Sequence, residues 1–191
     1  QSKLDIDRPV TDFLVECDYP DITIRQLLTH ATDLDPFILN RDQLSAEELR
    51  EAMFHLNRRN QPAFLYSDVH FLLLGFLLEK IFEQDLDQII EEQVLEPWGM
   101  KETMFGPIEF AVPTVRGVEA GNIHDPKARL LGKHAGSAGL FLTVKDLQIF
   151  LEHYLKDDFA ENLSRNYSPL DDKERSLAWN LEGAWLDHTG Y

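Results

Sequence analysis

The segment Phe64–Gly75 reads FLYSDVHFLLLG, and it places a tyrosine, a serine and an aspartate directly before a strongly apolar run. Ser67 is of a residue type that caps helices, because its hydroxyl can accept a hydrogen bond from a free N–H of the first turn. The spacing therefore predicts a helix over residues 68–81. This helix is apolar on nearly all sides, which is typical of a helix buried at the centre of a domain.

Two earlier helices begin with a recognisable capping signal. Thr23 and Ser45 are each followed three residues later by a glutamine or a glutamate. This pattern is a capping box, in which the two side chains satisfy free backbone N–H groups reciprocally. After Ser45 the apolar residues recur at three- and four-residue spacing, so we expect that helix to run to about Asn57.

The second half of the chain contains fewer helix signals. An amphipathic helix is expected over residues 86–95, ending at Pro97, because proline lacks the backbone donor that a helix interior requires. Residues 105–140 are rich in proline and glycine and show little periodicity, so we interpret them as long loops. Thr143 then opens a last clear helix, which should extend to about Leu155.

Only the C-terminal residues 176–191, SLAWNLEGAWLDHTGY, read as strands. A Glu182-Gly183 turn separates two short runs of aromatic and apolar residues, which predicts a β-hairpin. A lone hairpin is marginally stable in water and needs a sheet or a helix to pack against. The fold is therefore expected to be mainly α, with a small β element at the C-terminus.

Charge and composition exclude several classes of function. The net charge of −16 disfavours a nucleic-acid partner, because phosphate binding relies on clustered Lys and Arg. The single cysteine, Cys17, excludes an internal disulfide and a multi-cysteine metal site. The longest apolar stretch, residues 69–78, is too short for a transmembrane segment. His124-Asp125 has no third ligand nearby and is interpreted as a loop-fixing contact, so neither a metal nor a cofactor is expected.

Five segments resemble, in order, those of the serine β-lactamase, penicillin-binding-protein and esterase superfamily. They are ITIRQLLTH (22–30), FLYSDVHFLLLGFLLEKI (64–81), VLEPWGMKETMF (94–105), GNIHDPKARLLGKHAGSAGLFLTVKDLQIFL (121–151) and HTG (188–190). The resemblance covers nearly the whole chain, and it implies a part of that family's fold, which contains α and β domains. We expect the helical domain, with long loops, over residues 1–165, and a linker and strand remnant of the α/β domain over residues 166–191.

The family's first motif, Ser-x-x-Lys, supplies the nucleophile and its lysine, and no serine of this chain has a lysine three residues later. The opening residues 2–14, SKLDIDRPVTDFL, resemble the segment just after the nucleophile helix. The resemblance therefore implies a piece truncated at both ends, which begins downstream of its serine and ends within the strand of the third motif. Without the nucleophile this chain alone is expected to be inactive.

The resemblance also implies roles for five residues. Tyr66 corresponds to the tyrosine thought to shuttle a proton between the serine and the leaving group. Asp68 stands where asparagine is commoner, which favours pairing with a positive charge over hydrogen bonding to the substrate amide. His188, Thr189 and Gly190 match the third motif, which faces the acyl group and any substrate carboxylate. A histidine titrates near neutrality, so carboxylate recognition there should weaken as the pH rises.

The leading interpretation is thus a serine hydrolase that forms an acyl-enzyme with a β-lactam, a D-amino-acid peptide or an ester. Its partner in the parent enzyme is then a small-molecule or peptide substrate, and the open edges of the strand remnant could pair two copies of the chain. One alternative is a binding or scaffold domain that is naturally non-catalytic. Another is an unrelated helical interaction domain, which predicts that Tyr66 and His188 lie far apart. The resemblance leaves the compartment open between exported, cell-surface and cytoplasmic.

Overall fold

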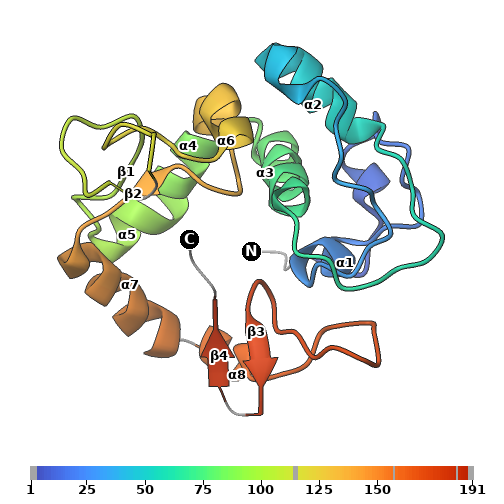
Figure 1. The fold of residues 1–191 in the computed structure, drawn as a ribbon. Helices are drawn as coiled ribbons and strands as arrows, with labels where there is room; N and C mark the ends of the chain where they lie inside the picture. The colour runs from blue at the N-terminus through green and yellow to red at the C-terminus, as the bar shows by residue number, and fades with distance from the viewer. Residues whose placement is uncertain (1–3, 114–115, 157, 184, 189–191) are drawn as a thin grey trace.

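The computed structural model describes residues 4–113, 116–156, 158–183 and 185–188 (Figure 1). Within these ranges helices predominate, and the strands form short antiparallel pairs. No helix in the described ranges is long and apolar enough to cross a bilayer. Short 3₁₀ turns occur at Val10–Asp12 (η1) and Arg41–Gln43 (η2).

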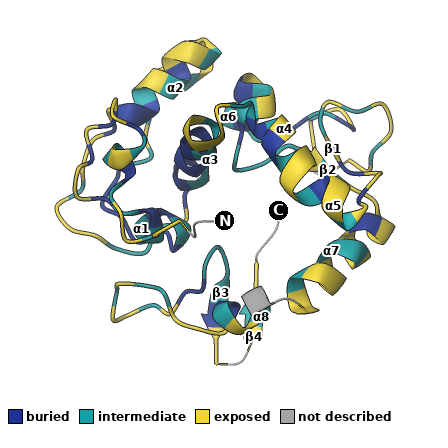
Figure 2. Ribbon diagram, turned by 180° about the vertical axis from the view of Figure 1, so that it is seen from behind, coloured by how far each residue is buried: buried dark blue, intermediate teal, exposed yellow. Residues whose placement is uncertain are grey.

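Helix α3, Asp68–Phe82, occupies the centre of the core, as predicted (Figure 2). The Ser67 hydroxyl caps it by accepting a hydrogen bond from the Val69 N–H at 3.3 Å. Helix α1, Ile24–Leu28, packs against α3 and begins with the expected Thr23 capping box. The local capping signals and the apolar pattern were therefore sufficient to place both helices.

Helix α2, Ala46–Phe54, begins at the predicted capping box but ends before the expected Asn57. The chain beyond it is extended, because the Asn57 carbonyl accepts a hydrogen bond from the Asp35 N–H and Arg58 forms a β-bridge with Leu34. These partners lie more than twenty positions away in the sequence. The local helical pattern could not show that these distant partners would bind the backbone of residues 57 and 58 in place of a further helical turn.

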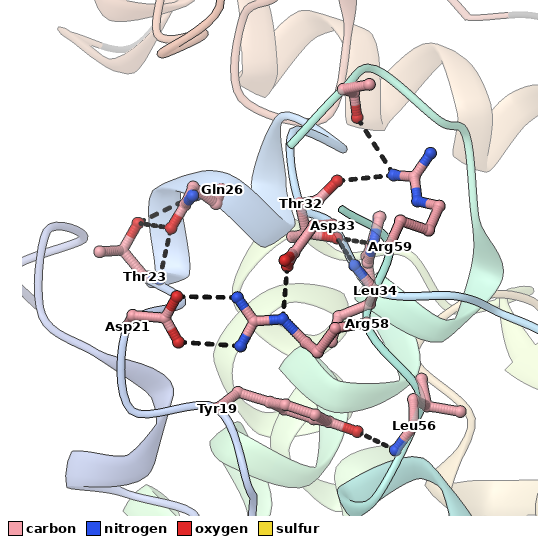
Figure 3. A network of polar contacts seen from close by, with 12 residues as sticks. Tyr19, Asp21, Thr23, Gln26, Thr32, Asp33, Leu34, Leu56, Arg58 and Arg59 are labelled. Atoms are coloured by element: carbon pink, nitrogen blue, oxygen red, sulfur yellow. Dashed lines mark hydrogen bonds and ion pairs between the residues drawn. The ribbon is translucent and has the colours of Figure 1, made fainter. Parts of the chain in front are cut away.

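An arginine network fixes this extended segment, which leads into α3 (Figure 3). Arg58 forms ion pairs with Asp21 and Asp33, each at 2.7 Å. The guanidinium of Arg59 donates a hydrogen bond to the Thr32 carbonyl at 2.7 Å. The start of α3 is therefore held from both sides, by its own cap and by the segment that precedes it.

The helix expected over residues 86–95 does not stop at Pro97. Helix α4, Leu86–Ile90, continues into a π-helical segment, Glu91–Leu95 (η3), and then into α5, Glu96–Trp98. Pro97 lies in the first turn of α5, where a missing backbone donor is tolerated. The helical run ends at Gly99, which has φ +74° and so adopts the left-handed conformation that glycine readily accepts.

Residues 105–140 are more ordered than the predicted long loops. Strand β1, Met104–Phe105, pairs antiparallel with β2, Leu140–Phe141. Between them lie α6, Pro126–Leu131, and the 3₁₀ turn η4, Gly132–His134. These elements are too short to show a clear periodicity, and the strand pair joins residues far apart in the sequence, so the loop prediction missed them. It is confirmed for the described residues 106–113, 116–125 and 135–139, which form neither helix nor strand.

Helix α7, Val144–Lys156, and the C-terminal hairpin agree with the prediction, whereas helix α8, Asp158–Leu163, between them was not predicted. The hairpin consists of β3, Asn180–Glu182, and β4, Trp185–Asp187. Both views place the hairpin between α1 and α7 (Figures 1 and 2). Most of α7 is exposed or partly exposed (Figure 2), and Asp146 is its one buried residue among those described.

Candidate active site

A cleft of about 670 Å³ opens at the N-terminal end of α3. Five separate parts of the chain line it: the loop before η2, the start of α3, the start of α6, the loop before β2, and the residue after β4. The polar side chains in its walls are Asp35, Tyr66, Ser67, Asp68, His124, Asp125, Lys127, Ser137 and His188. Residues from both halves of the chain therefore meet at one surface.

Tyr66 and His188 lie side by side in this cleft, although 122 positions separate them (188 − 66). Their ring centroids are 6.0 Å apart, with the rings at 68° to one another. His188 also makes an edge contact with Trp179, again at 6.0 Å between centroids. This proximity excludes an unrelated helical domain in which the two side chains would be distant.

Asp68, at the first position of α3, forms an ion pair with Lys127 of α6, with 3.1 Å between Oδ2 and Nζ. The same ammonium lies 3.8 Å from the Asp125 carboxylate, and only 13% of the Lys127 side chain is exposed. Partial burial strengthens such an attraction, because less water screens it. Lys127 was not singled out in the sequence. Its position became predictable only once α6, capped by Asp125, was placed beside α3.

A buried pair of histidines, His30 and His70, packs beside Tyr66. The ring of His30 lies 4.7 Å from that of Tyr66, and its Nδ1 lies 2.8 Å from Nδ1 of His70. The Ser67 N–H donates to His30 Nδ1, so His70 Nδ1 must carry the hydrogen of the bond that joins the rings. His70 Nε2 then accepts from the Thr32 hydroxyl at 2.8 Å. Burial, the largest cause for each, lowers the pKa of both imidazoles to about 3, so they are neutral at pH 7.

Ser137 also lines the cleft, from the glycine-rich loop before β2. Its hydroxyl is buried and has no hydrogen-bond partner among the described residues. The preceding Gly136 is pressed against α3, since a Cβ there would collide with the Phe71 carbonyl oxygen. This close approach of two backbones requires glycine and fixes the place of Ser137.

The family model described as "Beta-lactamase" matches residues 1–191, the whole of this chain. The chain belongs to the β-lactamase family. Its curated relatives include proteins named putative D-alanyl-D-alanine carboxypeptidase from Salmonella enteritidis and Salmonella gallinarum. These are 28% identical over 152 residues and 30% identical over 122 residues. The matches cover 62% and 52% of this chain but only 35% and 28% of the relatives, so they span about a third of those proteins.

Solved structures show the same β-lactamase-family fold. FmtA from Staphylococcus aureus matches 94% of this chain and 55% of its own, with a TM-score of 0.71 and 15% identity. A β-lactamase/D-alanine carboxypeptidase from Pseudomonas syringae matches 92% of this chain and 53% of its own, with a TM-score of 0.69 and 13% identity. A D-stereospecific amidohydrolase from Streptomyces matches with a TM-score of 0.61 at 20% identity, over 92% of this chain and 63% of its own. The members of the β-lactamase family are serine hydrolases, and this chain has their fold.

In this member of the β-lactamase family, a buried arginine also lies close to Tyr66. Arg175 is 2% exposed, and its guanidinium stacks over the ring of Phe64 at 5.1 Å. Its Nε has no hydrogen-bond partner among the described residues, while another of its nitrogens contacts the Asn180 side chain. Burial lowers the pKa of Arg175, and its attraction to Tyr66 and Asp187 acts in the opposite direction. No sequence pattern had indicated this residue.

Two of the site residues expected in a β-lactamase-family protein, Thr189 and Gly190, lie outside the described residues. In the described part of the chain, one group could hold a metal ion, with ligand atoms from Glu79, Asp85 and His134 within 4.8 Å of one another. Arg50 already pairs with Glu79 at 2.8 Å, and Lys133 contacts Asp85. We therefore interpret this group as an ion-pair network, and none of its members lines the cleft.

Proposed function

We propose that these residues form the Tyr66–Asp68–His188 side of an acyl-transfer site in a serine hydrolase. The activity of the parent enzyme would resemble that of the D-alanyl-D-alanine carboxypeptidases and amidohydrolases among the similar proteins. The observation that carries the proposal is the 6.0 Å approach of Tyr66 and His188 in a cleft that Asp68 also lines.

Tyr66 is the proposed proton carrier of this site. A phenol has an ordinary pKa near ~10, so it needs positive charge nearby to accept a proton at neutral pH. His188 borders the ring, and the buried guanidinium of Arg175 is attracted to Tyr66. With 45% of its surface exposed, Tyr66 is also accessible from the cleft. It can therefore take a proton from a nucleophile and return it to a leaving group.

Asp68 is proposed to set the charge of the cleft rather than to bind the substrate amide. Its carboxylate is already engaged by Lys127 at 3.1 Å, which is the charge-pairing role that aspartate favours over asparagine. Among the described residues that line the cleft, Asp35, Asp68 and Asp125 are acidic and Lys127 is the one lysine or arginine. This balance favours a neutral reacting group, such as the carbonyl of an ester, an amide or a lactam, near Tyr66.

The chain by itself is proposed to form no acyl-enzyme. The cleft contains Ser67 and Ser137, but neither is followed by a lysine three residues later. The Ser67 hydroxyl is engaged as the cap of α3, and the Ser137 oxygen is buried. Covalent catalysis requires an activated and accessible nucleophile, and these two hydroxyls do not provide one.

Two measurements on the 191-residue chain test the proposal. Intact-mass analysis after incubation with a penicillin and with a fluorophosphonate should show no adduct. NMR titration with N-acetyl-D-alanyl-D-alanine should move the resonances of Tyr66, Asp68 and His188, and Tyr66→Phe should weaken the binding. His153→Ala is a matched control, since His153 is exposed and stacks on Trp98 outside the cleft. A stoichiometric adduct would refute the claim that this chain has no activated nucleophile. Chemical-shift changes confined to residues outside the cleft would refute the assignment of Tyr66, Asp68 and His188 to the substrate site.

A further inference from the structure

Three polar residues lie in a row that crosses the C-terminal hairpin. Asn180 of β3 is opposite Asp187 of β4, and on its other side it forms a β-bridge with Arg175. The turn between Arg175 and Asn180 is tight, because the Ser176 N–H donates to the Trp179 carbonyl at 3.0 Å. Residues directly opposite one another in antiparallel strands have side chains on the same face, so all three can be in contact. We call Arg175, Asn180 and Asp187 the hairpin row.

The chemistry of the hairpin row allows one orientation of the central amide. The Arg175 guanidinium is only a donor and must meet the oxygen of Asn180, whereas the ionised Asp187 carboxylate is only an acceptor and must meet the nitrogen. Both contacts are present: Arg175 donates to Asn180 Oδ1, and Asn180 Nδ2 donates to Asp187 Oδ1 at 2.8 Å. The amide therefore links the Arg175 guanidinium to the last residue of β4, which directly precedes His188.

Arg175 gives the hairpin row a fixed end. It is 2% exposed, its guanidinium stacks over Phe64, and its backbone N–H donates to Asn166 Oδ1 at 3.1 Å. A buried cation is costly unless it is paired with negative charge. Attraction to Tyr66 and Asp187 opposes the effect of burial, which lowers the pKa of Arg175. The same guanidinium thus acts on the phenol of the cleft and on the strand that leads to His188.

His188 follows from this anchored strand. Side chains of neighbouring residues in a strand point to opposite faces, so fixing the side chain of Asp187 on one face directs His188 to the other. There the ring of His188 contacts the rings of Trp179 and Tyr66, each at 6.0 Å between centroids. The Trp179 indole N–H donates to the Tyr154 hydroxyl of α7. The hairpin is therefore held through the row as well as through Trp179.

We propose that the hairpin row positions His188 against Tyr66, with Asn180 as its central residue. This inference rests on the proposed function and adds a positioning residue to it, one that touches no reacting atom. A two-stranded hairpin is marginally stable by itself, so its polar anchor decides how firmly His188 is held. Loss of the anchor would leave both rings in the chain but not in contact.

Asn180→Asp breaks the hairpin row at one contact in the 191-residue chain. The introduced carboxylate still accepts from Arg175, but it faces Asp187 with a like charge, which is unfavourable between opposite strand residues. Hydrogen exchange of the β3 and β4 amides should become about fivefold faster, and the NOE between the rings of Tyr66 and His188 should weaken. Adding Asp187→Asn should restore both, because the introduced amide can donate to the introduced carboxylate.

Gln88→Glu is the matched control, because it also converts an amide into a carboxylate, at an exposed residue of α4 outside the hairpin. It should change neither the exchange nor the NOE. Asp187→Ala removes the same contact at an exposed position, so the test remains decisive even if Asn180→Asp fails to fold. An undiminished NOE in both hairpin variants, an equal effect in the control, or no recovery in the double variant would overturn the proposal. A lower urea midpoint with an intact NOE would also overturn it, since the row would then only stabilise the fold.

These readouts need no ligand, so they separate this inference from the proposed function. If they respond as expected while N-acetyl-D-alanyl-D-alanine leaves Tyr66 and His188 unmoved, the hairpin row is correct and the assigned chemistry is wrong. If the dipeptide moves both residues and the NOE persists in Asn180→Asp, only the positioning role is wrong.

Discussion

The buried His30–His70 pair should make this protein lose stability when it is acidified from pH 7 to pH 5. In the folded chain the pKa of both rings is lowered to about 3, whereas an unfolded histidine titrates near ~6.5. At pH values between the folded and the unfolded pKa, the unfolded state binds more protons than the folded state. The free energy of unfolding therefore decreases as the pH is lowered. At pH 5 the difference is about 2 kcal/mol for each ring, or about 4 kcal/mol for the pair.

The assay is urea unfolding at pH 7, 6 and 5, compared between the unchanged chain and His70→Asn. The asparagine amide can still donate to His30 Nδ1, but it does not titrate, so the loss between pH 7 and pH 5 should shrink to about 2 kcal/mol. The groups that act on His30 through space are His70, Arg175 and His188, which lower its pKa in addition to burial, and Asp68, which raises it. An equal loss in both proteins would refute the assignment of the pH dependence to this pair.

The exposed His55 changes the free energy of unfolding in the opposite direction on acidification, and it provides the control. Hydrogen bonds to Asp18 and Glu51 raise the pKa of His55. The protonated ring therefore stabilises the folded state at low pH, and this stabilisation is lost as the pH rises. His55→Gln should therefore leave the acid loss unchanged or make it slightly larger. A smaller loss in this variant would show that the dependence comes from another group.

Three further predictions concern the walls of the cleft and the hairpin. Lys127→Met leaves the Asp68 and Asp125 carboxylates facing each other without a cation and should lower the free energy of urea unfolding by about 1–3 kcal/mol. Gly136→Ala forces a methyl group against a backbone carbonyl of α3 and should destabilise by at least about 2 kcal/mol in thermal melts. In the described part of the chain the β3–β4 hairpin has no third strand, and β3 forms one further bridge, from Asn180 to Arg175, so light scattering should detect dimers at high concentration, and Trp185→Lys, at a 78%-exposed position, should reduce them.

The amino-acid sequence determined the features that depend on short-range physics. The caps Thr23, Ser45 and Ser67 were identified because a side chain and the N–H that it binds lie within three residues of one another. The buried character of α3 followed from an apolar surface on nearly all sides, and the hairpin followed from its Glu182-Gly183 turn. The family could be identified in the same way, because its motifs are short and occur in a fixed order.

Only the tertiary structure decided which of these pieces meet. The approach of Tyr66 to His188, the ion pair of Lys127 with Asp68 and the β1–β2 pair all join residues distant in the sequence. Their energies depend on the packing of α3, α6 and the hairpin, and no local pattern encodes that packing. The cavity lined by Ile90, Phe105 and Phe141 is of the same kind, since a cavity depends on how its walls are arranged and on where a glycine leaves a side chain out. Local signals thus place the chemical groups, and long-range packing brings them together into a site.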